Sequence, residues 1–261
     1  MSNIVVYTMG RTGSTWLIDY IIANFVQNSL PVYSLWEYWG ENRVFSVSNN
    51  QLVVEEPVDW DWAIENIDQD KLFNNKTQLI ESINIDNKIV RHTEHLGYTS
   101  QPYDYMITHN FQWITMARQD KFEQMLSMRL AQATNRWHAW STDDVSSYNK
   151  WHKENTHTIT IQSANSWFET YLEFVQRRRR LAEAGKIVGN IMYERMLQDS
   201  PRLIKDLLSS RGITEPIIIP PADFTDTTKK LSSAVEKQQF IANYDELHNW
   251  YNTSKWPSLL K

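Results

Sequence analysis

The sequence contains no cysteine. This absence excludes disulfide bonds, thiolate catalysis and metal sites built on cysteine. The sequence also lacks any run of the ~18 apolar residues that a membrane-spanning helix needs, so we expect no membrane span. Its first residues, Met1 to Tyr7, have neither the basic start nor the long apolar core of a secretory signal peptide. These absences together favour a cytoplasmic location.

Positive charge is not in excess either. The chain has 26 Lys and Arg against 31 Asp and Glu, which gives a formal net charge of -5. Binding to a nucleic-acid backbone requires an electropositive face, so we expect no nucleic-acid partner. A local basic pocket for a small anion is compatible with this balance. Nothing in the composition indicates an oligomeric state.

Aromatic residues are abundant, with 12 Trp, 12 Tyr and 9 Phe in 261 residues. In a soluble globular protein we expect most of them in the core. Others could line a pocket and stack on a sugar or another flat ligand. Two segments, 31–60 and 135–160, are rich in Trp and poor in regular pattern. We expect them to be irregular, to form an acceptor pocket, and in the second case to act as a lid or insertion.

Short apolar runs alternate with segments of helical periodicity along the chain. The runs predict strands at 4–8, 88–91, 105–108, 112–117 and 187–193. Apolar residues at helical spacing predict helices at 14–27, 76–83, 120–134, 163–184, 200–210 and 233–252. The run Arg177 to Arg180 is expected to be a solvated face near a helix end. This alternation predicts an α/β fold with a parallel sheet flanked by helices, in a single domain over 1–261.

An anion-binding loop is predicted between the first strand and the first helix. The segment reads Met9-Gly10-Arg11-Thr12-Gly13-Ser14-Thr15-Trp16. Backbone amides at the start of a helix point into such a loop, and its two glycines permit a tight path. The arginine adds a fixed positive charge, and the hydroxyl residues add donors. The segment therefore predicts a cradle for a phosphate or a sulfate.

Two other interpretations of this loop stay open. The nucleotide-triphosphate loop has the pattern G-x-x-x-x-G-K-[ST], but no Lys precedes Ser14 here and the two glycines are only three residues apart. A P-loop-type nucleotide or small-molecule kinase is therefore the alternative rather than the first choice. An ordinary strand-to-helix turn with a Ser or Thr cap would also use these residue types.

A second phosphate-binding motif is predicted about a hundred residues later. Arg118 follows a predicted strand and Ser127 lies nine residues on, within Arg-Gln-Asp-Lys-Phe-Glu-Gln-Met-Leu-Ser. Asp120 is well placed to cap the helix between them. Arg118 offers a two-pronged donor, and Ser127 lies two turns into the helix on a face that can turn back towards the same site.

With both motifs the sequence resembles the sulfotransferases that use 3′-phosphoadenosine 5′-phosphosulfate (PAPS), and is most similar to their bacterial trehalose-type branch. In that family an Arg or Lys precedes Ser/Thr-Gly-Ser/Thr-Thr and an apolar residue, as in the loop here. The resemblance implies a P-loop-NTPase-like parallel sheet, PAPS as sulfate donor, no metal, and a hydroxyl of a small molecule as acceptor, for example a carbohydrate or a glycolipid. It implies that the 5′-phosphosulfate is held by Gly10, Arg11, Thr12, Gly13, Ser14, Thr15 and Trp16, and the 3′-phosphate by Arg118 and Ser127.

Two weaker matches extend this resemblance. Residues 191–197 resemble a strand followed by Tyr-Glu that occurs late in many sulfotransferases, which implies that Tyr193 neighbours the adenosine and that Glu194 is structural. Residues 226–232 resemble a C-terminal segment of the family, which implies that Lys229 or Lys230 closes over the 3′-phosphate.

The residues that carry out the chemistry are predicted less uniquely. Arg11 is the candidate for stabilising the leaving oxygen, and the acceptor hydroxyl needs a general base. Glu37, in Glu37-Tyr38-Trp39, resembles the base of the trehalose-type branch and is preferred. The alternatives are His92 and His95, since Lys-Ile-Val-Arg-His at 88–92 resembles the strand ending in Lys-x-His of cytosolic sulfotransferases, with Arg91 as the charge-stabilising group. A non-catalytic relative that keeps the nucleotide site stays a further alternative.

Overall fold

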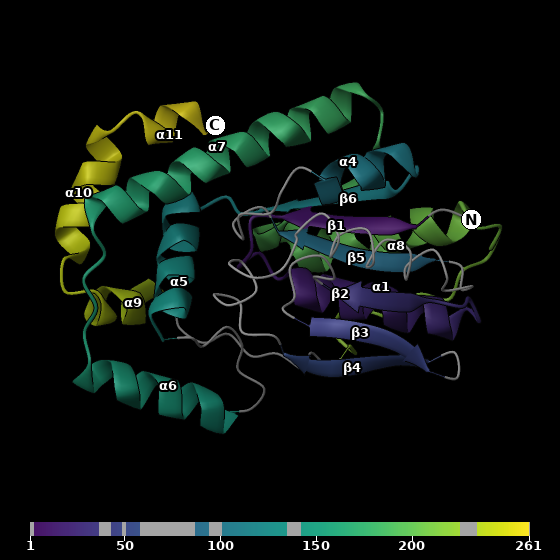
Figure 1. Ribbon diagram of the computed structural model, residues 1–261, viewed down its shortest axis with the longest axis horizontal. Helices are drawn as coiled ribbons and strands as arrows, with labels where there is room; N and C mark the ends of the chain where they lie inside the picture. Colours follow the sequence, from purple (N-terminus) through teal and green to yellow (C-terminus); the bar gives the residue numbers. More distant parts are fainter. Residues whose placement is uncertain are drawn as a thin grey trace.

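A five-stranded parallel sheet forms the centre of the protein (Figure 1). The computed structural model describes residues 3–36, 43–48, 51–57, 87–93, 101–134, 142–224 and 234–260. Within these ranges the sheet has the order β2-β5-β1-β6-β7. Its strands are β1 (Ile4–Thr8), β2 (Tyr33–Trp36), β5 (Lys88–Thr93), β6 (Gln112–Ala117) and β7 (Ile187–Met192). The predicted fold class, an α/β protein with a parallel sheet flanked by helices, is confirmed.

Helices cover both faces of this sheet. On one face lie α1 (Ser14–Gln27) and α8 (Met196–Ser209), and on the other α4 (Gln101–Thr108) and α7 (Ile161–Glu183). The helices at the left of Figure 1 are α5 (Lys121–Thr134), α6 (Thr142–Glu154), α9 (Ala234–Phe240), α10 (Tyr244–Thr253) and α11 (Trp256–Leu259). An antiparallel hairpin, β3 (Arg43–Ser48) with β4 (Gln51–Pro57), lies beyond the β2 edge.

The central strand β1 is buried on both faces, which explains its unbroken apolar run. Successive side chains of a strand point to opposite faces. Ile4 and Val6 therefore pack in the cluster that contains α1 and α8, while Val5 and Tyr7 pack in the cluster that contains α4 and α7.

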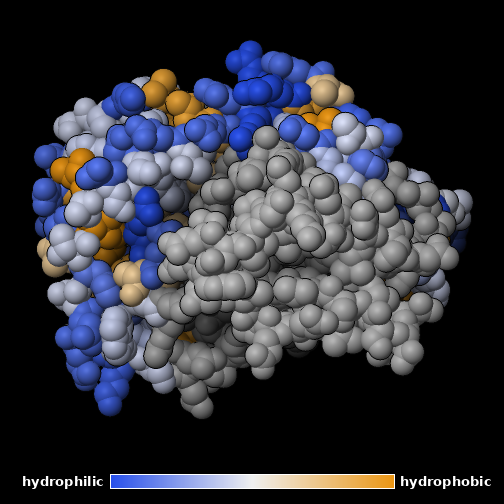
Figure 2. Space-filling model, in the orientation of Figure 1, coloured by the Kyte–Doolittle hydropathy of each residue, from blue (hydrophilic) through white to orange (hydrophobic). Residues whose placement is uncertain are grey.

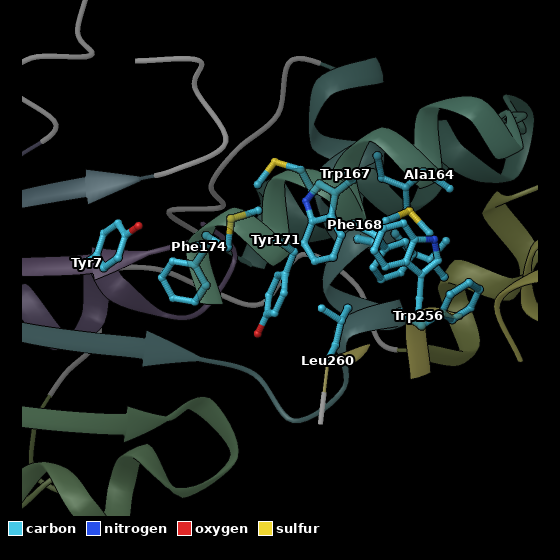
Figure 3. Packing of buried hydrophobic residues seen from close by; sticks show 14 of the residues in the cluster. Tyr7, Ala164, Trp167, Phe168, Tyr171, Phe174, Trp256 and Leu260 are labelled. Atoms are coloured by element: carbon cyan, nitrogen blue, oxygen red, sulfur yellow. The ribbon is translucent and has the colours of Figure 1, made fainter. Parts of the chain in front are cut away.

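An aromatic stripe on α7 connects the sheet to the C-terminal helices (Figure 3). Four aromatic residues and one alanine lie along this stripe and are almost fully buried: Ala164, Trp167, Phe168, Tyr171 and Phe174. At one end, Phe174 lies 4.9 Å from Tyr7 of β1 between ring centroids. At the other end, Phe168 stacks on Trp256 with its centroid 5.6 Å away. Much of the aromatic content of the chain therefore forms core, as its composition predicts.

The arginine run on α7 is not the uniform solvated face that we expected. The Arg177 guanidinium lies over the Tyr103 ring, 5.5 Å from its centroid. Arg178 is half-buried and donates to Asn190 Oδ1 at 2.8 Å. Arg179 is exposed and pairs with Glu183 one turn on. The first two arginines of the run therefore contact α4 and β7, and only the later ones are exposed.

Three predicted segments have a different structure. Residues 105–108 belong to α4 and not to a strand, and Met106 is fully buried from that helix. A short apolar run is compatible with either element. The 31–60 and 135–160 segments contain regular elements, namely β2, the β3–β4 hairpin and α6. The predicted helix 76–83 lies outside the described residues.

The predicted helix at 233–252 is two helices, α9 and α10. The chain leaves helical geometry at Ile241, which forms a parallel bridge with His157. The His157 amide donates to the Phe240 carbonyl oxygen at 2.8 Å, and the Ala242 amide donates to the His157 carbonyl oxygen at 2.8 Å. This long-range backbone pairing replaces the helical hydrogen bonds at that point.

The visible surface of the described residues is mainly hydrophilic, with small hydrophobic areas between the polar ones (Figure 2). In the described ranges, no helix has both the length and the apolar character needed to cross a membrane.

The aromatic stripe predicts a large contribution to stability. Phe168→Ala removes a fully buried ring that stacks on two other rings, and it should lower the free energy of unfolding by about 3–5 kcal/mol, measured by denaturant titration. The control Leu197→Ala changes a side chain that is 60% exposed and should stay within about 0.5 kcal/mol. Equal effects of the two substitutions would contradict the packing described here.

Candidate functional site: an anion-binding loop

The register of the sheet brings four strand ends to one edge. Thr8 of β1 lies beside Thr93 of β5 and Met116 of β6, and Ala117 lies beside Met192 of β7. All five strands run in the same direction, so the residues that follow them emerge together. In open α/β sheets this carboxyl edge is where ligands bind. Here it carries the loop 9–13, Arg118 and Tyr193.

The loop 9–13 has an unusual backbone. Gly10, Arg11 and Gly13 all have positive φ, at 76°, 55° and 75°. Gly13 is the N-cap of α1, and it provides no side-chain acceptor for the first amides of that helix. The first turn of α1 also contains no acidic residue. Those amides and the positive end of the helix dipole are therefore available to an external anion.

Two other helices, α5 and α7, begin with a side-chain cap. The N-terminus of α5 is capped by Asp120, whose Oδ1 accepts from the Glu123 amide at 2.9 Å, as the sequence predicts. The N-terminus of α7 is capped by Thr160, whose Oγ1 accepts from the Ser163 amide at 3.1 Å. Helix α1 lacks such a cap, as do α8, α10 and α11, but its N-terminus is the one that follows the loop 9–13.

Threonine hydroxyls and a close contact hold the loop in shape. The Thr8 hydroxyl accepts from the Gly10 amide at 3.2 Å and is hydrogen-bonded to the Thr12 hydroxyl. Thr12 is fully buried, so its hydroxyl ties the loop to β1. A Cβ at Gly13 would lie 3.2 Å from both the Tyr193 ring and the Met196 methyl group. This close approach and the positive φ both favour glycine at this position.

Two arginines from separate motifs meet at this edge. Arg118 has a side chain that is 12% exposed, and its guanidinium carbon lies 4.5 Å above the Tyr193 ring centroid. Burial lowers the pKa of Arg11, and the positive charge of Arg118 lowers it further. Two cations held together in a largely buried position favour a bound anion.

Glu194 supports Arg118. One carboxylate oxygen lies 3.9 Å from Arg118 Nε, and the other accepts from the Gln119 amide at 2.9 Å. This carboxylate fixes both the side chain and the backbone just after β6. The arrangement matches the structural role that the resemblance implies for Glu194.

Arg91 and His92 point to opposite faces of the sheet. Arg91 Nη1 donates to Thr15 Oγ1 at 2.9 Å, which brings this arginine to the first turn of α1. His92 is only 2% exposed and stacks on Tyr7, with ring centroids 5.6 Å apart. Burial and the nearby charge of Arg177 lower the pKa of His92 to about 3. The structure therefore brings Arg91, but not His92, to the first turn of α1 beside the loop 9–13.

The remaining predicted residues fall into three groups. Ser14 and Thr15 are the first two residues of α1, and both are buried. Trp16 stacks on Tyr20 in the core at 4.8 Å, and the Ser127 hydroxyl donates to the Glu123 carbonyl oxygen at 2.9 Å within α5. Outside the described residues lie Glu37, His95, Lys229 and Lys230.

The structure adds two residues that sequence reasoning did not select. Gln124 of α5 is fully buried, and its Nε2 donates to the Gly10 carbonyl oxygen at 2.6 Å. It lies one turn before Ser127. In the sequence it is a polar residue among the apolar positions of that helix, and this feature could have indicated it. Tyr148 of α6 is 2% exposed, and its electrostatic interaction raises the pKa of Arg11 against the effect of burial. No signal marked Tyr148, because its segment was expected to be irregular.

No protein-family model matches the sequence, and no curated protein matches it either. Among solved structures, the chain is similar to the sulfotransferase domain from the curacin biosynthetic pathway, at 12% sequence identity and a TM-score of 0.42. The alignment covers 97% of this chain and 91% of that domain. A similarity this remote does not indicate what the chain binds or catalyses. In the ranges that the structure describes, no group of three His, Asp or Glu residues could hold a metal ion.

The position of His92 predicts a specific pH dependence of stability. Its pKa is about 3 in the folded protein and 6.5 in the unfolded chain, so below pH 6.5 the unfolded chain binds a proton that the folded protein does not. The free energy of unfolding should therefore decrease as the pH is lowered below 6.5, by up to about 1.4 kcal/mol per pH unit from this residue alone. His92→Phe should remove that part of the slope between pH 6.5 and 5, measured by denaturant titration.

The control Leu197→Ala changes an exposed side chain that does not titrate and should leave the slope as it is in the wild type. A His92→Phe slope equal to that of the wild type would show that His92 is protonated in the folded protein.

Proposed function

We propose that the protein is a PAPS-dependent sulfotransferase that transfers a sulfuryl group to a hydroxyl of a small molecule. The observation that supports this most is the convergence of two anion-binding motifs about a hundred residues apart. Gln124, from the helix that follows Arg118, is hydrogen-bonded to Gly10 of the loop. Tyr193 contacts both Arg118 and the Gly13 position.

Two separate anchors suit a ligand with two separate anionic groups. PAPS carries a 5′-phosphosulfate and a 3′-phosphate on one adenosine. In the proposal the loop and the open N-terminus of α1 hold the first group, and Arg118 with Ser127 holds the second. The loop has no Lys of the kind that grips the phosphates of a nucleoside triphosphate, which favours PAPS over ATP.

The proposed reaction needs orientation and charge neutralisation more than covalent help from the protein. The acceptor oxygen forms a bond to sulfur while the bond from sulfur to the 5′-phosphate oxygen breaks. Adenosine 3′,5′-bisphosphate leaves with the additional negative charge on that oxygen. Arg11, Arg91 and the first amides of α1 would stabilise it, and a general base would take the proton of the acceptor hydroxyl.

Glu37 is the base that we propose. It follows Trp36, the last residue of β2, and β2 is parallel to the strands whose ends form the candidate site. His92 supports the role less well, because it is buried on the opposite face beside Tyr7 and a pKa of about 3 makes it a weak proton acceptor. The acceptor is proposed to enter between the segments 31–60 and 135–160.

Binding of the nucleotide product tests this proposal. Calorimetry should detect adenosine 3′,5′-bisphosphate without added metal, and Arg118→Ala should weaken that binding about 100-fold through loss of charge-assisted hydrogen bonds to the 3′-phosphate. The control Arg195→Ala removes an arginine that is 66% exposed and paired with Asp199, and it should leave the affinity unchanged.

Failure to bind the bisphosphate at millimolar concentration would overturn the proposal. Magnesium-dependent ATP turnover in its place would identify a kinase. Binding of PAPS without sulfate transfer to any of a panel of hydroxyl acceptors would identify a non-catalytic relative.

Turnover separates the candidate bases. Glu37→Gln should lower kcat by about 100-fold or more while the affinity for adenosine 3′,5′-bisphosphate is retained, since a general base contributes about 10²–10⁴ in rate. His92→Gln should affect stability rather than the kcat of the folded fraction. Full turnover by both variants would mean that another residue is the base.

A further inference from the structure

We infer that Gln124 is a positioning residue that holds the peptide between Gly10 and Arg11 in its anion-binding orientation and thereby joins the two anion-binding motifs. The inference rests on the proposed function for the identity of the natural ligand. Its structural basis is independent of that identity, because it concerns the loop and α5 only.

The contact is short and fully enclosed. Gln124 Nε2 lies 2.6 Å from the Gly10 carbonyl oxygen, and the residue has no exposed surface. Its Oε1 is buried and has no hydrogen-bond partner among the described residues. A buried acceptor without a partner is destabilising, and an apolar residue of the same size would avoid that cost. The amide at this position is therefore better explained by the loop than by core packing.

The loop needs such a restraint. Arg11 has a φ of 55°, in the left-handed region that is unfavourable for a residue with a Cβ. It lies between two glycines that also have positive φ and have many other conformations open to them. A strained backbone of this kind persists only when its surroundings determine it. Two hydrogen bonds fix the backbone on the two sides of Gly10: Gln124 Nε2 donates to its carbonyl oxygen, and its amide donates to Thr8 Oγ1.

The geometry of the peptide bond explains how this hydrogen bond affects anion binding. The Gly10 carbonyl group and the Arg11 amide belong to one planar trans unit, so they point in opposite directions. Once Gln124 turns the carbonyl oxygen towards α5, the Arg11 amide must face away from α5. The bond also keeps a carbonyl oxygen, which would repel an anion, turned towards the protein interior.

The same helix carries Ser127 of the second motif, and Arg118 lies between β6 and this helix. Gln124 lies between Arg118 and Ser127 in sequence, and its helix is capped by Asp120. A shift of α5 would thus move Ser127 and the Gly10 peptide together. Gln124 should matter for ligands that occupy the loop and not for ligands that occupy only the second motif.

Three adenosine phosphates test this distinction by calorimetry. Gln124→Met keeps the size of the side chain and removes the donor. It should weaken adenosine 5′-monophosphate and adenosine 3′,5′-bisphosphate by about tenfold each, as expected for one hydrogen bond, and leave adenosine 3′-monophosphate unchanged. Gln132→Met, at an exposed position of the same helix, is the matched control and should change none of the three affinities.

A pH series separates positioning from a general structural effect. Gln124→Glu should bind adenosine 5′-monophosphate weakly at pH 8, because the carboxylate cannot donate to the Gly10 oxygen. Relative to the wild type at each pH, its affinity should recover as the pH falls and the carboxyl group gains a proton that it can donate. Thermal melting of each variant gives the folded fraction used in every titration.

The outcomes distinguish the two proposals. If the wild type fails to bind adenosine 3′,5′-bisphosphate, the proposed function is wrong. Binding of inorganic pyrophosphate to the wild type and to Gln124→Met then tests the inference about the loop. If the wild type and Gln124→Met have the same affinity for every phosphate probe, the inference about Gln124 is overturned. Equal weakening of the 3′- and 5′-monophosphates would also overturn it, since that indicates a general loss of structure.

Discussion

The site depends on the parallel register of β1 with its neighbours. Thr8 is aligned with Thr93 on one side and with Met116 on the other, and β7 continues the alignment at Met192. Because these strands share a direction and end together, segments that are far apart in sequence begin their loops within reach of one another. A different register would separate the loop from Arg118, whatever the local sequence of either motif.

Electrostatic repulsion follows from that alignment. The edge collects Arg11, Arg91 and Arg118, and the carboxylate of Glu194 approaches Arg118 only to 3.9 Å. Burial already lowers the pKa of Arg11, and the second guanidinium lowers it further. A dianionic group in the loop would relieve the repulsion and also accept hydrogen bonds from the uncapped start of α1. Ligand binding and fold stability should therefore be coupled here, since a ligand that binds only the folded state stabilises it.

Local patterns were sufficient for the first strand and the first helix, whose bounds agree with the prediction residue for residue. They failed where a distant partner decides the structure. Residues 105–108 are helical because Met106 packs into the core from α4, and α9 ends where His157 pairs with the chain at Ile241. For the candidate site, sequence indicated the loop and Arg118. It did not reveal Gln124, because the hydrogen bond to Gly10 spans 114 positions.

The period of a β-strand also decides which of two adjacent residues can act at the site. Arg91 and His92 are neighbours in sequence, yet one reaches Thr15 in the loop region and the other stacks on Tyr7 beneath α7. A motif aligned on sequence alone treats them as equivalent, whereas a one-residue step in a strand changes the face. A base drawn from β5 would therefore need the facing of Arg91 and not that of His92. Glu37, the proposed base, comes directly after the last residue of β2 in the sequence.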